Sequence, residues 1–264
     1  MSIYIDQIGS QVEIKQKPTR IISLVPSQTE LLHYLGINDE VVGITKFCVH
    51  PTEWFRSKAR IGGTKTVDIK KIRDFAPDLI IANKEENVQE QVEELSKNFP
   101  VWISDINTLP DAFEMIEEVG KITGRTQPAK ELVNKIEQSL LELTTLNLLR
   151  KTRAGYLIWK NPYMSVGGDT FISEMLKALG VENIFQNKHR YPQVTIDDLK
   201  ECELLLLSSE PYPFKQNDID ELKAVLPNTQ IMLVDGELFS WYGSRLLHSA
   251  SYFKQLRRDI SSLL

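Results

Sequence analysis

Three short blocks of this 264-residue chain recur in the same order on either side of its middle. The members of each pair share the placement of their apolar and charged residues, and the pairs are residues 30–37 with 174–181, 68–74 with 195–201, and 101–105 with 231–235. Chance likeness between strand–helix units is the alternative explanation, but the shared order favours duplication. The pattern therefore predicts two similar α/β lobes rather than one continuous sheet.

The longest helical pattern of the chain, residues 126–149, lies between the two sets of blocks. Its only proline, Pro128, falls in the first turn, where proline is tolerated. Its apolar stripe consists of Leu132, Ile136, Leu140 and Leu143. About 24 residues at ~1.5 Å each give a rod of roughly 36 Å. We expect residues 125–151 to connect a lobe of residues 1–124 to a lobe of residues 152–264.

Short β-branched runs alternate with the helical patterns, and several are apolar on both faces, as in buried parallel strands. The strand candidates are residues 20–25, 41–44, 79–82, 101–103, 154–159, 204–207 and 230–234. A small hairpin is expected before them, from residues 3–5 to residues 12–14, with its turn at Gly9-Ser10. This alternation predicts the mainly parallel sheets of an α/β protein.

The composition argues against several classes of function. The net charge is −5 and the lysines and arginines form no basic stripe, so nucleic acid is not expected as a partner. The longest apolar runs are far too short to span a bilayer. No phosphate-binding loop, dinucleotide fingerprint or catalytic motif occurs, although catalytic groups can also converge from distant positions.

The first ten residues, MSIYIDQIGS, contain neither the basic region nor the apolar region of an export signal. The two cysteines, Cys48 and Cys202, lie far apart and predict reduced thiols rather than a disulfide framework. Taken alone, these features favour a cytosolic protein.

Candidate binding residues lie in loops that follow predicted strands, because ligands of α/β proteins bind beyond the carboxyl ends of strands. Ser27 and Glu30 have the spacing of a capping box, at the start of a helix that ends at Gly36. The glycine pairs Gly62-Gly63 and Gly167-Gly168 are interpreted as tight turns, in preference to phosphate sites.

The segment from Phe47 to Pro51 contains the pattern Cys48-x-His50. Two such side chains are too few for a stable zinc site, which needs three or four ligands. We therefore expect no metal site here. Either this loop borders a binding cleft or its residues simply pack.

Six aromatic residues of the second half follow strands or lie in loops, and they are Trp159, Tyr163, Tyr191, Phe239, Trp241 and Tyr242. They could wall a pocket for a large flat ligand or fill the lobe cores. Both interpretations fit Trp159 equally well. For Trp241 and Tyr242, in the sequence Ser-Trp-Tyr-Gly-Ser, exposure in a cleft is favoured.

Acidic residues follow equivalent strands in both halves: Glu85, Glu86 and Glu90 in the first and Glu210 in the second. Most such carboxylates are solvated surface groups. A matched acidic site on each lobe is also what docking onto arginines of a partner would require.

Residues 20–32 resemble the opening of the substrate-binding proteins of cobalamin and iron-siderophore ABC importers. Further stretches resemble that family in the family's order, and they are residues 6–9, 41–43, 61–63, 76–82, 167–171, 191–194 and 235–240. The resemblance covers about residues 5 to 260 and is closest to the cobalamin-binding branch of these helical-backbone metal receptors.

The resemblance implies a class III periplasmic-binding-protein fold, in which one long α-helix bridges two Rossmann-like lobes with mainly parallel sheets. It implies a ligand held between the lobes, which close only modestly around it. It also implies a periplasmic or membrane-surface location, whereas the first residues and the cysteines taken alone favour the cytosol. It also implies docking of one glutamate per lobe onto permease arginines. Glu210 lies in that region of the second lobe, and Glu86 and Glu90 flank the first-lobe position, Gln89. Asn83 stands where cobalamin binders can place an aromatic residue, so the ligand can differ from cobalamin.

We expect a monomeric, non-enzymatic binding protein with no cofactor of its own. Its ligand is a bulky metal-containing molecule, a corrinoid first and an iron–siderophore or haem second. The alternatives are an intracellular carrier or sensor and a corrinoid- or chelate-processing enzyme on the same scaffold. The predicted ligand-binding residues are Pro26, Ser27, Phe47, His50, Gly62, Gly63, Trp159, Tyr191, Phe239, Trp241, Tyr242 and Arg245. For Arg245, pairing with a neighbouring carboxylate is equally expected.

Overall fold

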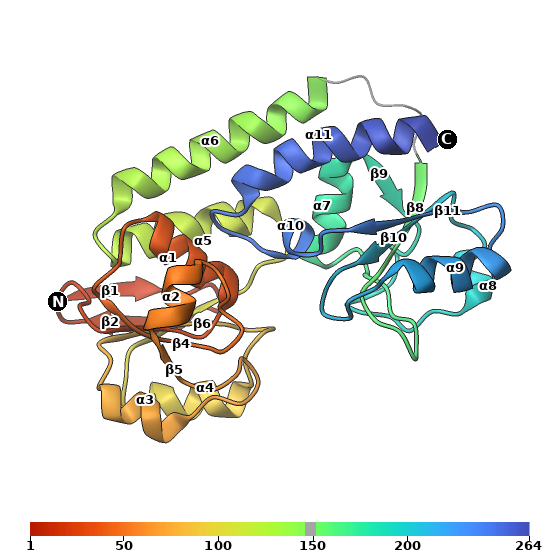
Figure 1. Ribbon diagram of the computed structural model, residues 1–264. Helices are drawn as coiled ribbons and strands as arrows, with labels where there is room; N and C mark the ends of the chain where they lie inside the picture. Colours follow the sequence, from red (N-terminus) through yellow and green to blue (C-terminus); the bar gives the residue numbers. More distant parts are fainter. Residues whose placement is uncertain (146–151, 264) are drawn as a thin grey trace. The chain divides into compact units, whose positions relative to one another are not determined.

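The computed structural model describes residues 1–145 and 152–263, and the chain divides into two compact units (Figure 1). Unit 1 comprises Met1–Ile106, Pro110–Asn134 and Tyr242–Arg245. Unit 2 comprises Asn107–Leu109, Lys135–Trp241 and Leu246–Leu264. Each unit is an α/β lobe with its own parallel sheet.

The sheet of unit 1 has the strand order β5-β4-β3-β6-β7, with every neighbouring pair parallel. Its strands are β3 (Ile21–Ser23), β4 (Val41–Ile44), β5 (Ala59–Arg60), β6 (Leu79–Asn83) and β7 (Val101–Ser104). The helices that follow these strands are α1 (Pro26–Tyr34), α2 (Thr52–Ser57), α3 (Ile69–Phe75), α4 (Gln89–Ser96) and α5 (Leu109–Ile122). The predicted hairpin is confirmed as β1 (Ser2–Ile5) paired antiparallel with β2 (Gln11–Ile14).

The sheet of unit 2 has the strand order β11-β10-β8-β9 and is also parallel throughout. Its strands are β8 (Thr152–Leu157), β9 (Val181–Asn183), β10 (Leu204–Ser208) and β11 (Gln230–Val234). Its helices are α7 (Phe171–Leu179), α8 (Ile196–Leu199), α9 (Gln216–Val225), α10 (Glu237–Ser240) and α11 (Leu246–Leu263). All residues of β10 are buried, as expected for a central strand covered on both faces.

The predicted duplication is confirmed by topology. The order β4-β3-β6-β7 in unit 1 corresponds strand for strand to β9-β8-β10-β11 in unit 2. The equivalent helices α1 and α7 also end alike, each followed by a glycine in the left-handed region, Gly36 at φ 74° and Gly180 at φ 93°. A side chain is strained in that conformation, which explains glycine at both helix ends.

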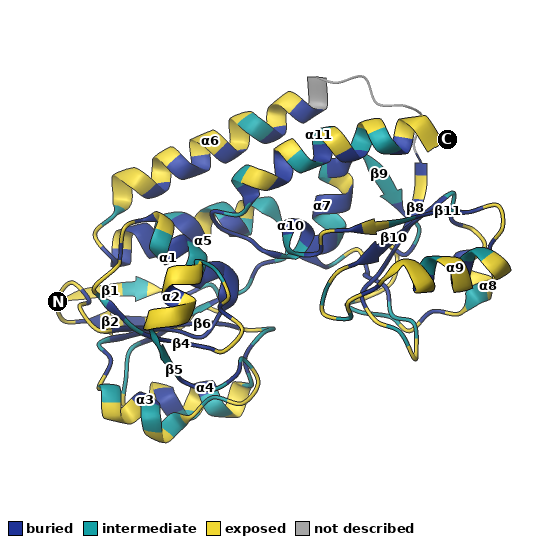
Figure 2. Cartoon of the chain, viewed as in Figure 1, coloured by how far each residue is buried: buried dark blue, intermediate teal, exposed yellow. Residues whose placement is uncertain are grey.

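Helix α6 (Thr126–Thr145) begins among the residues of unit 1 and continues among those of unit 2. Its predicted apolar stripe is confirmed, since Leu132, Ile136, Leu140 and Leu143 are all buried. Figure 2 shows buried and exposed residues alternating along α6. The rest of the predicted helix, residues 146–149, lies outside the described residues. None of the helices in the described parts of the chain combines the length and apolar character needed to cross a bilayer.

The predicted capping box at Ser27 and Glu30 is wrong. Helix α1 begins at Pro26, its N-cap is Val25, and no side chain caps it. Proline at the first helical position already has a helical φ and lacks an N–H, so the helix starts before Ser27. The short strands β5 and β9 were also not predicted from the sequence, because runs of two or three residues show no clear alternation.

Arginine side chains stabilise the carboxyl ends of both equivalent helices. Arg125 donates from Nε to the carbonyl of Leu35, 3.1 Å away, just after α1. Arg257 of α11 donates to the carbonyls of Ala178 and Leu179 at 3.0 and 2.7 Å, and also to the carbonyl of Leu143 in α6. A cation there pairs with the unsatisfied carbonyls and the negative end of the helix dipole.

We expect Arg257→Met to lower the free energy of unfolding by about 2 kcal/mol, because half-buried carbonyls lose their donor. Urea denaturation measures this loss. Arg258→Met is the matched control, since Arg258 is the next residue of α11 and is exposed. The control should change stability by less than about 0.5 kcal/mol. Equal losses in the two variants would contradict the role given to Arg257.

Candidate functional site

The carboxyl edge of the unit 1 sheet is lined by a buried polar network. Asn83, at the end of β6, donates from Nδ2 to Ser104 Oγ at 3.0 Å, and Gln28 Nε2 donates to the same oxygen at 2.5 Å. Asn83 Oδ1 accepts the backbone N–H groups of Glu85 and Glu86 at 2.8 and 3.0 Å. Asn83 therefore holds the loop that carries the two glutamates, a role that its sequence position alone did not indicate.

Three oxygen atoms of this region are buried without a hydrogen-bond partner: Ser27 Oγ, Gln28 Oε1 and Ser244 Oγ. Buried polar groups are nearly always satisfied by protein, water or ligand. Ser27 and Gln28 lie in the first turn of α1, directly after β3. The structure thus supports the expectation that Pro26 and Ser27 border a polar site, while their contact with a ligand stays a prediction.

The segment Tyr242–Arg245 belongs to unit 1, although the chain on both sides of it belongs to unit 2. Tyr242 donates its hydroxyl to Glu86 Oε1 at 3.2 Å. Arg245 forms a bidentate pair with Glu30, at 2.9 and 2.7 Å. Of the two expectations for Arg245, pairing with a carboxylate is therefore confirmed. Burial raises the pKa of Tyr242 well above its usual value, and the Glu86 carboxylate raises it further.

The predicted exposure of Trp241 and Tyr242 is wrong, since their exposed fractions are 8% and 6%. Trp241 donates Nε1–H to Glu210 Oε1 at 3.1 Å. Phe239, also predicted to line the site, is fully buried and lies between Tyr156 and Phe253, with ring centroids 5.1 and 4.8 Å away. Phe239 is a core residue because α10 turns its apolar side toward β8 and α11.

Unit 2 presents an exposed aromatic side chain just after β8. Trp159 is 41% exposed and contacts Tyr212 edge-on, at 6.0 Å between ring centroids. The neighbouring Lys160 binds Asp218 at 2.7 Å and Glu221 at 2.6 Å. These hydrogen bonds raise the pKa of Lys160 and anchor the turn that carries Trp159.

In unit 1, the loop after β4 exposes Phe47, whose ring lies 5.1 Å from the ammonium of Lys46. His50 is half-buried in the same loop, whereas Cys48 is fully buried and contacts Thr29 and Thr45. Burial raises the pKa of the Cys48 thiol, which disfavours the thiolate that metal binding requires. Over the described residues, no group of three or more His, Cys, Asp or Glu side chains could hold a metal ion.

Both glycine pairs lie at close backbone approaches. A Cβ atom on Gly62 would lie 2.4 Å from the carbonyl oxygen of Thr66, and Gly62 has φ 100°. A Cβ atom on Gly167 would lie 2.4 Å from the carbonyl oxygen of Lys188. The preferred interpretation, tight turns, therefore agrees with the structure.

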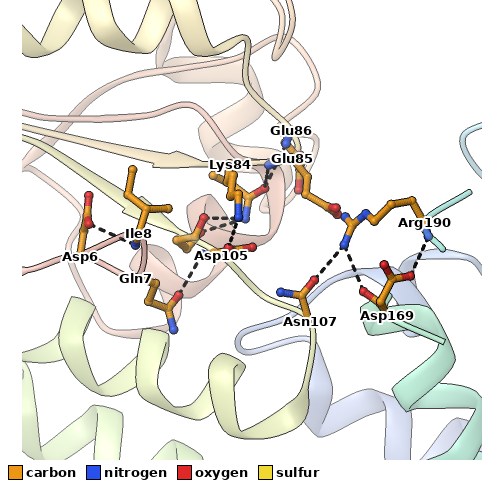
Figure 3. A network of polar contacts seen from close by, with 12 residues as sticks. Asp6, Gln7, Ile8, Lys84, Glu85, Glu86, Asp105, Asn107, Asp169 and Arg190 are labelled. Atoms are coloured by element: carbon orange, nitrogen blue, oxygen red, sulfur yellow. Dashed lines mark hydrogen bonds and ion pairs between the residues drawn. The ribbon is translucent and has the colours of Figure 1, made fainter. Parts of the chain in front are cut away.

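The predicted docking glutamates differ in their surroundings. Glu210 Oε1 accepts from Ser240 Oγ at 2.6 Å as well as from Trp241. Burial raises the pKa of Glu210 despite these two hydrogen bonds. Glu86 is half-buried and accepts from the Tyr242 hydroxyl, and Glu90 is exposed on α4. Docking by these residues stays a prediction. Lys84, in the loop that carries Glu86, donates to Asp105, which directly follows β7, at 2.5 Å (Figure 3).

Comparison with known proteins gives a consistent family match. Residues 21–205 match the family model described as periplasmic binding protein. The vitamin B12-binding protein of Vibrio parahaemolyticus is 26% identical over 212 residues, covering 78% of this chain and 77% of that protein. The uncharacterized ABC transporter substrate-binding lipoprotein YvrC of Bacillus subtilis is 26% identical over 204 residues, covering 73% of this chain and 64% of YvrC.

Solved structures share the fold. The vitamin B12 binding protein BtuF of Vibrio cholerae has a TM-score of 0.73 at 20% identity, over 92% of this chain and 98% of BtuF. The siderophore binding protein BauB has a TM-score of 0.81 at 17% identity, over 97% and 98%. At such identities the likeness shows the two-lobed fold alone.

The Glu210 carboxyl should make stability depend on pH. A raised folded pKa means that the folded state binds this proton more tightly than the unfolded state, whose pKa is near the ordinary 4.5. The stability that this proton contributes is therefore present below the ordinary pKa and is lost as the pH rises through the raised folded pKa, whereas Glu210→Gln, which does not titrate, avoids this loss. Urea denaturation should show that the free energy of unfolding of the variant, relative to that of the wild type, increases as the pH rises.

The exposed Glu90→Gln provides the control for that series and should track the wild type at every pH. A Glu210→Gln variant whose stability relative to the wild type does not change with pH would show that the Glu210 carboxyl is not perturbed.

Proposed function

Because the chain belongs to the periplasmic binding protein family, we propose that it is the substrate-binding component of an ABC importer. Its cargo is a bulky metal-containing small molecule, a corrinoid first and an iron–siderophore or haem second. The curated relatives named as vitamin B12-binding proteins support the corrinoid. The metal belongs to the cargo and is not a cofactor of the protein.

The observation that carries the proposal is that each of the two units has an exposed aromatic side chain in a loop at the carboxyl edge of its sheet. Phe47 follows β4 in unit 1 and Trp159 follows β8 in unit 2, each beyond the carboxyl edge of its own sheet. Ligands of parallel α/β units bind at that edge. A large flat metal complex gains affinity from such aromatic surfaces and orientation from a few polar groups.

The remaining predicted residues have two roles in the proposal. Pro26, Ser27, His50, Gly62, Gly63 and Tyr191 are assigned to contact with the ligand. Trp241, Tyr242 and Arg245 donate hydrogen bonds to Glu210, Glu86 and Glu30, respectively. We assign these three residues to fixing the loops at the carboxyl edges of the two sheets.

The proposed partner is an ABC permease, which the protein reaches from the periplasm or from the membrane surface. The lipoprotein YvrC, named as an ABC transporter substrate-binding protein, supports this assignment. Glu86, Glu90 and Glu210 are its candidate docking residues. Binding without catalysis is part of the proposal, and relatives named as binding proteins support it. An enzyme acting on the same ligand is the competing function.

One experiment separates binding from catalysis. The purified protein is mixed with cyanocobalamin, haem and a ferric siderophore, and the chromophore that co-elutes with it is identified by its absorption spectrum. We expect one stoichiometric complex from which the ligand is recovered unchanged. Recovery of a chemically altered ligand would favour the enzyme, and the absence of any complex would contradict the proposed cargo.

We expect Trp159→Ala to weaken ligand binding by about tenfold while leaving the midpoint of unfolding unchanged, because the side chain is largely exposed. Titration of the ligand followed by absorption measures the affinity. Tyr34→Ala is the matched control, since Tyr34 is also 41% exposed but lies at the far end of α1 from the carboxyl edge. Equal effects of the two variants would rule out a specific role for Trp159.

A further inference from the structure

Asn87 ends the loop between β6 and α4 in unit 1, one residue before the helix N-cap Val88. Its exposed fraction is only 6%. A primary amide offers an acceptor oxygen and two N–H donors, and buried groups of this kind are nearly always hydrogen-bonded. The partners of the Asn87 side chain therefore show which segments of the chain it joins.

The side-chain oxygen of Asn87 closes the loop to which the residue belongs. Asn87 Oδ1 accepts the backbone N–H of Asn83 at 2.8 Å, and the backbone N–H of Asn87 donates to the carbonyl of Asn83 at 3.1 Å. Asn83 Oδ1 in turn accepts the N–H groups of Glu85 and Glu86. Two asparagine side chains thus fix the conformation of the loop, a role typical of this residue in turns.

The side-chain nitrogen of Asn87 reaches two other loops at the carboxyl edge of the same sheet. Asn87 Nδ2 donates to the carbonyl of Thr64 at 3.0 Å and, more weakly, to the carbonyl of Leu24 at 3.4 Å. Thr64 directly follows the Gly62-Gly63 pair, and Leu24 lies between β3 and Pro26, the first residue of α1. One side chain therefore joins three loops that are distant along the chain.

Two further side chains connect the turn after Gly62-Gly63 to the same region. Lys65 Nζ donates to the carbonyl of Glu85 at 2.5 Å. Gln91 Oε1 accepts from the N–H of Val67 at 3.1 Å, and its Nε2 donates to the Lys65 carbonyl at 3.3 Å. Lys65 is exposed and Gln91 is half-buried, so water competes for these bonds. The buried amide of Asn87 is shielded from that competition.

We propose that Asn87 is a positioning residue of the ligand-binding edge of unit 1. Without contacting the cargo, its side chain holds the Gly62-Gly63 turn and the start of α1 in the arrangement that receives the cargo. This inference rests on the proposed function, which assigns Ser27 and the glycine pair to contact with the ligand. Loops that are ordered before binding lose less conformational entropy when the ligand binds, and the affinity is higher for that reason.

Asn87→Asp changes one group of the side chain and almost none of its volume. The carboxylate keeps an oxygen for the N–H of Asn83, but its other oxygen replaces the donor that faces the carbonyls of Thr64 and Leu24. We expect the variant to bind about tenfold more weakly whichever of cyanocobalamin, haem and ferric desferrioxamine the wild type binds. Asn98→Asp is the matched control, because it adds the same charge at an exposed position just beyond α4. The control should change the affinity by less than about twofold.

Asn87→Ser tests the same hydrogen bond without a new charge, and it serves as the test if Asn87→Asp does not fold. The serine hydroxyl can still accept from the N–H of Asn83, but it is too short to reach the carbonyl of Thr64. We expect an affinity about fivefold lower than that of the wild type, with the same ligand.

Hydrogen exchange of the ligand-free proteins, followed residue by residue by NMR, separates positioning from a contribution to global stability. The N–H groups of Gly63 and Thr66 each donate to the other residue's carbonyl within the turn, at 2.9 and 3.3 Å. Loss of the Asn87 donor should make these two amides exchange about tenfold faster, because the turn opens more often. A role in global stability alone would instead accelerate the amides of Ile80 and Ile81 in the buried strand β6 and leave the turn amides unchanged.

Unchanged affinity of the Asn87 variants, or unchanged exchange of the Gly63 and Thr66 amides, would overturn this inference and leave the proposed function intact. Failure of the wild type to bind any of the three ligands would overturn the proposed function and, with it, the role of Asn87 in binding. The exchange rates would then still decide whether Asn87 positions the turn.

Discussion

The parallel arrangement of every strand pair in the two main sheets governs where this protein can place functional groups. Parallel strands need crossover helices, which cover the faces of a sheet and leave its carboxyl edge for loops. Residues of β6 and β10 are accordingly buried throughout. Groups that meet a ligand must therefore come from the loops after these strands, in both copies of the duplicated unit.

The carboxyl edges of the two sheets contain carboxylates that accept hydrogen bonds from other side chains of the protein. The chain passes from unit 2 to unit 1 between Trp241 and Tyr242, and each of these neighbours binds a glutamate of its own unit, Glu210 or Glu86. A carboxylate that accepts buried donors is held in one orientation, and burial raises the pKa of Glu210. The same residues are the candidates for docking, so internal order and partner recognition would draw on one set of groups.

The two edges differ in polarity. Unit 1 has buried oxygens without a hydrogen-bond partner at Ser27 and Gln28, whereas unit 2 exposes the aromatic ring of Trp159. Polar groups orient a ligand more than they add affinity, which comes mainly from apolar contact. Selectivity among metal complexes would then depend on the substituents around the metal-binding ring or chelate.

The amino-acid sequence by itself determined the duplication, the parallel α/β class, the long helix and the glycine that ends α1. These features follow from local periodicity and from residues with restricted backbone conformations, and both are visible in the order of residues. The sequence also located the loops at the carboxyl edges of the sheets, because it located the strand ends.

Only the tertiary structure decided which side chains in those loops are available. Trp241 and Tyr242 were predicted to be exposed and Phe239 to bind the ligand, yet the structure buries all three. Their partners, such as Tyr156 and Glu86, lie far away along the chain. Whether an aromatic ring fills a core or meets solvent depends on such distant neighbours, and local spacing contains no information about them.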